Sequence, residues 1–232
     1  MAWTLTGRNF TKGTYVATAN VGDVFTPAQD DIILVFSAMN NTSPHDAVTG
    51  WGATWVQLQA PTGTNNNFTV WAARMGASPG SGQVNIDFGA ASANHASGVI
   101  QISGAHTTAA IGTGGANLFR QLVASSAYDP ASPFSITALS AFASTTNLSL
   151  TLGCISTNLP ITPKAGFTEL LESSGATYNP NVWCSYKVTE DGSQNMNEAT
   201  AGDFDFKYLT GIAIEILEAG GSPPVLMGQI CT

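Results

Sequence analysis

One short stretch of the chain, Ser43-Pro44-His45-Asp46, carries a hydroxyl, an imidazole and a carboxylate within four residues. In a Ser-His-Asp triad the imidazole takes the hydroxyl proton and the carboxylate orients the ring, but the three groups come from different loops. We therefore interpret the stretch as a polar turn that contains Asp46. His95 and His106 lack the spacing of zinc ligands, and the sequence assigns no catalytic residue, metal ligand or cofactor.

Carboxylates offer two other chemistries. Glycoside hydrolysis needs two of them about 5 to 10 Å apart across a cleft, and Glu169, Glu172 and Glu215 lie on expected strands without a feature that singles them out. Calcium needs six to eight oxygen ligands, and no calcium-loop pattern is present. We expect the remaining acidic residues to be solvated turn or strand residues: Asp30, Asp31, Glu190, Asp191, Asp203 and Asp205.

The three cysteines do not form a disulfide framework. Cys154 and Cys184 alternate with apolar residues, so we expect buried thiols. A bridge between these two stays open as the alternative, because its geometry is unknown. Cys231 stands one residue from the end, where an unpaired thiol is expected.

Four tryptophans lie at or near expected strands: Trp51, Trp55, Trp71 and Trp183. Exposed aromatic rings can stack on sugars, but aromatic residues that repeat at equivalent strand positions more often belong to a core or a subunit contact. We favour the core interpretation and keep Trp51 as the residue that would contact a glycan.

The elements that must position these residues are strands. Apolar residues recur at every second position, as in Val84-Asn85-Ile86-Asp87-Phe88, which predicts strands with one dry and one wet face. The expected runs are 32–38, 53–59, 67–75, 83–88, 96–103, 147–155, 166–172, 181–188, 202–207 and 209–217, with extended segments near 3–6, 14–19 and 132–139. Helical spacing is found only at 117–125, where it predicts at most a turn or two.

The runs repeat in two halves. Residues 31–35 match 147–151, 55–58 match 167–170, Val70-Trp71 matches Val182-Trp183, and Gly98-Val99 matches Gly211-Ile212, with offsets of 112 to 116 residues. This period is too long for a solenoid and indicates duplication of a sheet-forming unit. We predict an all-β fold, an antiparallel jelly-roll-like β-sandwich with internal duplication. It forms a single domain over 1–219, built from pseudo-repeats at about 14–104 and 132–218, with 105–128 as a linker or surface loop.

The charge content of the chain excludes some classes of function and favours others. Only 9% of the 232 residues are charged, the net charge is −8, and the seven Lys and Arg residues are dispersed. Nucleic-acid backbones require clustered cations, so direct nucleic-acid binding is not expected. No secretory leader or membrane span is recognisable. A neutral surface rich in Ser, Thr and Asn fits a particle-bound existence with many subunit contacts.

Four segments carry a resemblance: residues 52–58 (GATWVQL), 68–74 (FTVWAAR), 77–86 (ASPGSGQVNI) and 99–105 (VIQISGA). They resemble a jelly-roll-like β-sandwich family of tailed-phage and prophage structural proteins, and the second half repeats their order. The resemblance implies a virion component, such as a capsid decoration protein, head fibre or tail-associated protein, released with the particle by lysis of the host in whose cytoplasm it assembles. It brings no catalytic residues.

The C-terminal residues 220–232 combine a Gly- and Pro-rich hinge with an apolar strip of Val225, Leu226, Met227 and Ile230. We expect these residues to act as an assembly arm that binds other capsid or tail subunits. The primary hypothesis is thus a non-enzymatic capsid decoration protein, itself a homo-oligomer and plausibly a trimer. The alternatives are a receptor- or glycan-binding module of a tail or fibre and, third, a glycan-active enzyme.

Overall fold

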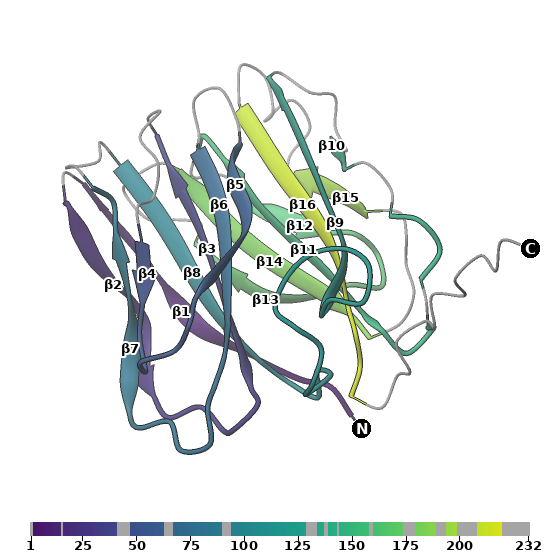
Figure 1. Ribbon diagram of the computed structural model, residues 1–232. Coiled ribbons are helices and arrows are strands. Elements are labelled where there is room, and N and C mark those ends of the chain that lie inside the picture. Colours follow the sequence, from purple (N-terminus) through teal and green to yellow (C-terminus); the bar gives the residue numbers. More distant parts are fainter. Residues whose placement is uncertain are drawn as a thin grey trace, which may run out of the picture.

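The computed structural model describes residues 2–14, 16–40, 47–62, 67–89, 94–128, 134–136, 139–142, 144–157, 160–173, 180–188, 194–198 and 208–219. These residues form strands and turns and contain no helix (Figure 1). The predicted all-β class is confirmed. The prediction of a helical turn or two at 117–125 is wrong, because residues 119–128 form a strand.

The first half contains β1 to β8 in two antiparallel sheets. The first large sheet has the order β1-β8-β3-β6-β5, and the first small sheet has the order β2-β7-β4. The strands are β1 (Thr4–Thr14), β2 (Thr18–Phe25), β3 (Ile32–Met39), β4 (Ala47–Thr49), β5 (Val56–Thr62), β6 (Asn67–Arg74), β7 (Gly82–Asp87) and β8 (Asn94–Ser103).

The second half repeats this arrangement with β9 to β16. The second large sheet has the order β13-β14-β11-β16-β9, and the second small sheet has the order β10-β15-β12. The strands are β9 (Phe119–Tyr128), β10 (Phe134–Ile136), β11 (Leu148–Ile155), β12 (Ile161–Pro163), β13 (Thr168–Glu172), β14 (Asn181–Lys187), β15 (Gln194–Glu198) and β16 (Tyr208–Ile216). The expected run at 202–207 lies outside the described residues.

Adding eight to each strand number of the first half gives the order of the second half, so the duplication extends to the complete topology. Each half is an eight-stranded jelly roll. Strands outside the five clear runs per half are of two kinds. Strands such as β4 and β12 are too short to show alternation, while the edge strands β1 and β9 of the large sheets are half-buried along most of their length and lack an apolar face.

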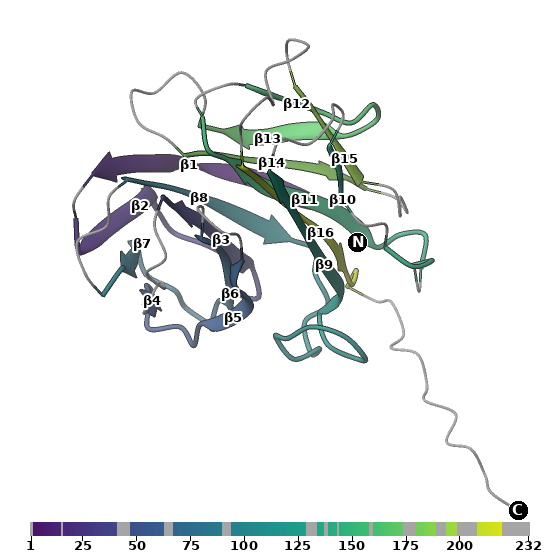
Figure 2. The same ribbon diagram turned by 90° about the horizontal axis from the view of Figure 1, so that it is seen from above.

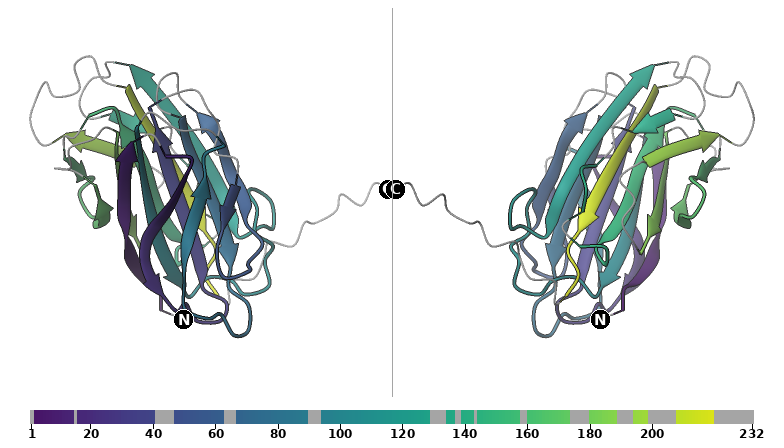
Figure 3. Two further views of the ribbon diagram at one scale, coloured as in Figure 1. Left: turned by 90° about the vertical axis from the view of Figure 1, so that its left-hand side faces the viewer. Right: turned by 90° about the vertical axis from the view of Figure 1, so that its right-hand side faces the viewer.

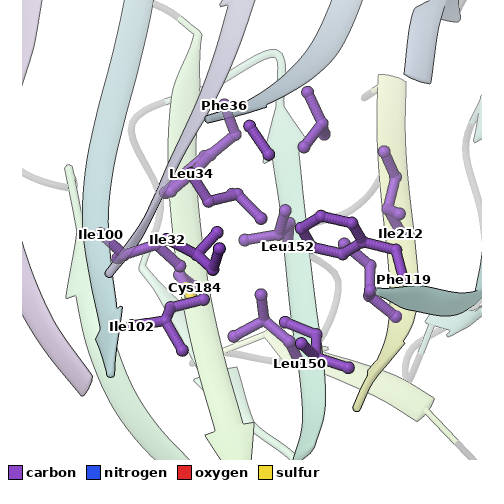
Figure 4. Packing of buried hydrophobic residues seen from close by; sticks show 14 of the residues in the cluster. Ile32, Leu34, Phe36, Ile100, Ile102, Phe119, Leu150, Leu152, Cys184 and Ile212 are labelled. Atoms are coloured by element: carbon purple, nitrogen blue, oxygen red, sulfur yellow. The ribbon is translucent and has the colours of Figure 1, made fainter. Parts of the chain in front are cut away.

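The two halves stack as four layers, with the large sheets face to face in the middle and the small sheets outside (Figure 2). The long strands of both halves run in roughly the same direction (Figure 3), as in aligned sandwich packing. A central core between the large sheets joins the halves, and Leu34 and Ile100 from the first half face Leu152 and Ile212 from the second (Figure 4).

Each half also has its own outer core between its large and small sheets. Ile33, Val35 and Val99 face Val84 and Ile86 in the first half. In the second half, Ile155, Trp183 and Leu209 face Phe134 and Ile161. The large sheets are therefore covered on both sides.

This double coverage corrects the expectation of one wet face per strand. Every residue of β3 and β11 is buried, including Ser149 and Thr151. The hydroxyl-bearing residues that make β11 read as half-wet lie on a buried face, because a second layer covers it.

The matched residues also identify which faces correspond. Val70 and Val182 lie in the central core, while Trp71 and Trp183 lie against the outer cores, so this match is correct. The match of Gly98-Val99 with Gly211-Ile212 is wrong by one residue, since Val99 faces the outer core and Ile212 the central core. A shift of one residue exchanges the two faces of a strand.

The connection between the halves is folded. Ala105, Ala109 and Leu118 belong to the central core. Arg74 Nη2, at the end of β6, donates to His106 O (2.6 Å), and His106 N donates to Leu217 O (3.0 Å) next to β16. Residues 105–118 therefore close the side of the central core that lies between β6 and β16.

Candidate functional site

On the opposite side of the central core, the edge strands β1 and β13 lie side by side and form a seam between the halves (Figure 1). A cleft of about 330 Å³ lies at this seam. Its walls come from β1, β2 and β13, and its lining residues are Gly7, Asn9, Phe10, Asp23, Leu170, Leu171 and Glu172. We define these seven residues as the seam cleft.

Both walls of the seam cleft are interrupted strands. The pairing of β1 shifts between Gly7 and Phe10, and Asn9 has a φ of 69°. Asparagine tolerates this left-handed region, and here its Oδ1 accepts a hydrogen bond from Phe10 N at 2.9 Å. The pairing of β13 shifts between Glu169 and Leu171. Bulges of this kind redirect side chains and are enriched beside binding sites.

The two walls approach closely because β1 has a glycine at the contact. A Cβ atom on Gly7 would lie 2.6 Å from Leu170 O. The sequence Gly7-Arg8-Asn9, in an otherwise extended segment, is thus the local feature that lets the halves meet and bulge at this point.

The polar groups of the seam cleft are mainly acceptors. Asp23 Oδ1 accepts a hydrogen bond from Asn9 Nδ2 at 3.2 Å, and Glu172 Oε1 accepts one from Ile161 N. These contacts fix both carboxylates.

The cations nearest in sequence to the cleft are engaged elsewhere. Arg8 donates from Nε to Gln101 Oε1 at 2.8 Å and lies 4.4 Å from the centre of the Phe25 ring. Lys12 donates from Nζ to Ser173 O at 3.3 Å, and partial burial lowers its pKa to about 8. None of the described residues lining the cleft is cationic.

A second group of polar residues is internal. Asp31 is 3% exposed; its Oδ1 accepts from Ser103 Oγ at 2.5 Å, and its Oδ2 accepts from Ala28 N at 2.7 Å and from Gln101 Nε2. The expectation of a solvated turn residue is wrong for Asp31. Its carboxylate instead fixes the start of β3.

The second half has a related arrangement with acid and amide exchanged. Glu215 is 1% exposed and accepts from Asn147 Nδ2 and Gln121 Nε2, both at 2.6 Å. Asn147 precedes β11 as Asp31 precedes β3, and Glu215 lies on β16 as Gln101 lies on β8. The pair Asp31–Gln101 thus corresponds to Asn147–Glu215.

The three glutamates considered for glycoside hydrolysis have different surroundings. Glu215 is enclosed by amides, Glu169 is exposed, and Glu172 lies in the seam cleft. Glu215 and Glu169 do not line the cleft. The residue that joins Glu172 there is Asp23, which the sequence did not single out.

The histidines lie in unrelated surroundings. His95 is 1% exposed, and its ring centre lies 4.8 Å from that of Phe88 with the rings tilted by 40°. Neither ring nitrogen has a hydrogen-bond partner among the described residues. Burial lowers its pKa to about 4. His106 accepts from Ala109 N at Nδ1 (3.1 Å). Ser43, His45 and Asp46 lie outside the described residues.

The tryptophans lie where the core interpretation places them. Trp51, Trp55 and Trp71 pack against the first outer core, and Trp183 is buried in the second. The Trp51 ring lies 4.9 Å from the Phe25 ring, and its Nε1 is buried. Trp51 therefore packs at the edge of the first outer core, and its contact with a glycan stays a prediction.

Cys154 and Cys184 are free, fully buried thiols of the central core. Burial raises the pKa of Cys154 to about 12, partly opposed by hydrogen bonds with Thr210, and raises that of Cys184 further. The predicted buried thiols are confirmed, and the alternative bridge is not formed.

Several predicted residues are not described by the structure. The apolar strip of Val225, Leu226, Met227 and Ile230, together with Cys231, lies outside the described residues, as do Glu190, Asp191, Asp203 and Asp205. Within the described ranges, no three or more His, Cys, Asp or Glu side chains are grouped to hold a metal ion. None of the described segments is a helix long and apolar enough to span a membrane.

Comparisons with known proteins found no match among family models, curated proteins or solved structures.

Proposed function

We propose that this chain is a structural protein of a virus particle, most specifically a capsid decoration protein that binds the assembled shell through subunit contacts. The observation that carries the proposal is the central core, which joins two jelly rolls into one block. A block with both large sheets covered on each side keeps its surfaces in fixed relation, as a bridge between neighbouring subunits requires.

Composition supports the same function. The chain is 24.0 kDa with only 9% charged residues, and surfaces poor in charge favour association over free diffusion. The resemblance of residues 52–58, 68–74, 77–86 and 99–105 to phage structural proteins points in the same direction. A ligand that binds only the assembled state stabilises that state by mass action.

The proposal places the chain on the virion, in contact with capsid or tail subunits, and as a homo-oligomer for which a trimer is the working hypothesis. Residues 220–232 would serve as the arm that fastens it. Deleting them should leave the four-layer block folded and weaken particle binding.

The decisive experiment is cryo-electron microscopy of intact particles from the source of this chain, combined with mass spectrometry for copy number. Many regularly spaced copies on the head would support decoration. A few copies at the tail or fibre tip would replace it with adhesion, and absence from the particle would refute a virion role. In the same particles, deletion of 220–232 with unchanged occupancy would refute the role of the arm.

A further inference from the structure

We infer that the seam cleft is a binding site for a neutral sugar residue, a site that goes beyond the proposed structural role and does not depend on it. The first argument is its place: the walls are strands of both halves, held together by the central core, so the cleft is formed before any ligand arrives. Its volume of about 330 Å³ lies within the range of small-molecule sites.

The second argument is the chemistry of the lining. The carboxylate of Asp23 accepts a hydrogen bond from Asn9 Nδ2, and that of Glu172 accepts one from Ile161 N. The Leu170 carbonyl, in the β13 wall, faces Gly7 of the β1 wall. The cleft is therefore rich in fixed acceptors and suits a ligand that carries several hydrogen-bond donors, as a sugar does with its hydroxyl groups.

The third argument is the apolar part of the lining. Phe10 and Leu170, both partly buried against the central core, also line the cleft and suit the C–H faces of a sugar ring, because aromatic and aliphatic side chains bury such surfaces. Two carboxylates without a lining cation disfavour anionic ligands. A neutral sugar residue satisfies both the acceptors and the apolar surface.

Two bulges at one place strengthen the assignment. β1 bulges at Asn9 and β13 bulges between Glu169 and Leu171, so both halves depart from regular pairing at the same cleft. In β1 the left-handed Asn9 holds Asp23 through its Nδ2, which makes the bulge a positioning element for one of the carboxylates.

The test uses the full chain and four neutral disaccharides as probes: maltose, lactose, cellobiose and chitobiose. Amide chemical shifts are followed by NMR during titration, because weak affinity is expected for so small a site. The expected result is saturable binding of at least one disaccharide with shifts at Gly7, Phe10 and Leu171.

The variants Asp23→Asn and Glu172→Gln keep the shape and the internal acceptor but remove the charge. Each should weaken sugar binding about tenfold or more, the loss expected for a hydrogen bond to a charged group. The matched control is Glu169→Gln, on the same strand but outside the cleft, which should leave the affinity unchanged.

Four outcomes would overturn the inference. Binding of none of the four probes, or shifts confined to another surface, would exclude the cleft as a sugar site. Equal affinity in both cleft variants and the control would do the same. Binding of arginine methyl ester in place of the sugars, lost at high salt, would assign the cleft to a cationic ligand. None of these results would alter the copy number on particles, so the proposed function is tested separately.

Discussion

Replacement of Leu152 by alanine tests whether the central core makes one cooperative unit of the two jelly rolls. Leu152 lies on β11 of the second half, is fully buried, and faces Ile32 and Leu34 of the first half (Figure 4). The Leu152 side chain therefore packs against residues of both halves. The variant should therefore destabilise β3 as much as β11.

The magnitude follows from burial. Truncation of a fully buried leucine costs about 2 to 5 kcal/mol, the upper part applying where the site cannot collapse. Two facing sheets, each covered on its other side, leave little freedom to collapse, so we expect about 3 to 4 kcal/mol.

Two measurements check this prediction. Urea unfolding followed by tryptophan fluorescence should show one transition with a lower midpoint and an unchanged slope. Native-state hydrogen exchange should show the slowest amides of β3 and β11 accelerated by the same factor, roughly a hundredfold or more for such a loss. The control is Val24→Ala, at a residue that is 66% exposed, for which we expect a change within about 0.5 kcal/mol.

The reasoning would be refuted by a variant in which only the second half loses protection. Two separate urea transitions, with the first unaffected by Leu152→Ala, would have the same meaning. Either result would show that the halves fold independently and only rest against each other.

Three further predictions concern single sites. Gly153→Ala should destabilise the protein by several kcal/mol, as overpacking of a core does, because the added Cβ would overlap the indole ring of Trp183 on β14. Gly76→Ala, at a glycine with open space around it, should leave the stability unchanged, and thermal unfolding of both variants measures the difference. As pH falls from 6.5 toward 4, His95 should bind a proton in the unfolded chain before it does so in the folded protein, which lowers the free energy of unfolding by about 3 kcal/mol over that range. Urea midpoints measured against pH should show this fall for the unchanged protein and should lack it for His95→Leu. Cys154 and Cys184 should resist a thiol reagent in the native protein and react on unfolding, and native labelling of either at the rate of an unfolded thiol would contradict their burial.

Several strand positions could be predicted from the sequence because alternation or a continuous apolar run survives in the inner strands of the large sheets, whereas the edge strands β1 and β9 lack it. The runs at 32–38, 147–155 and 209–217 correspond to β3, β11 and β16. The four-layer arrangement was harder to predict from the sequence. The continuous apolar run Ile32-Ile33-Leu34-Val35-Phe36 does signal burial on both faces, but its counterpart in β11 carries Ser149 and Thr151 and hides that signal.

The seam cleft could not be predicted because its residues are distant in sequence. Asp23 and Glu172 are separated by most of the two halves, and no spacing rule relates β2 to β13. What the sequence does contain is the cause of the bulge, since Gly7 and Asn9 are residue types that permit close approach and a positive φ. Their meaning depends on the strand they face, which only the fold supplies.

The connection between the two halves makes the two sides of the central core unequal. Two face-to-face copies have two lateral seams, but one chain must cross from the first copy to the second. Residues 105–118 make that crossing between β6 and β16 and pack Ala109 and Leu118 into the central core. The seam on that side is thereby occupied by the connection, while β1 and β13 meet directly on the other. A connected duplicate cannot be fully symmetric: among the described residues, both halves line the cleft at the seam of β1 and β13, whereas the pocket at the connection is lined by residues 106–117.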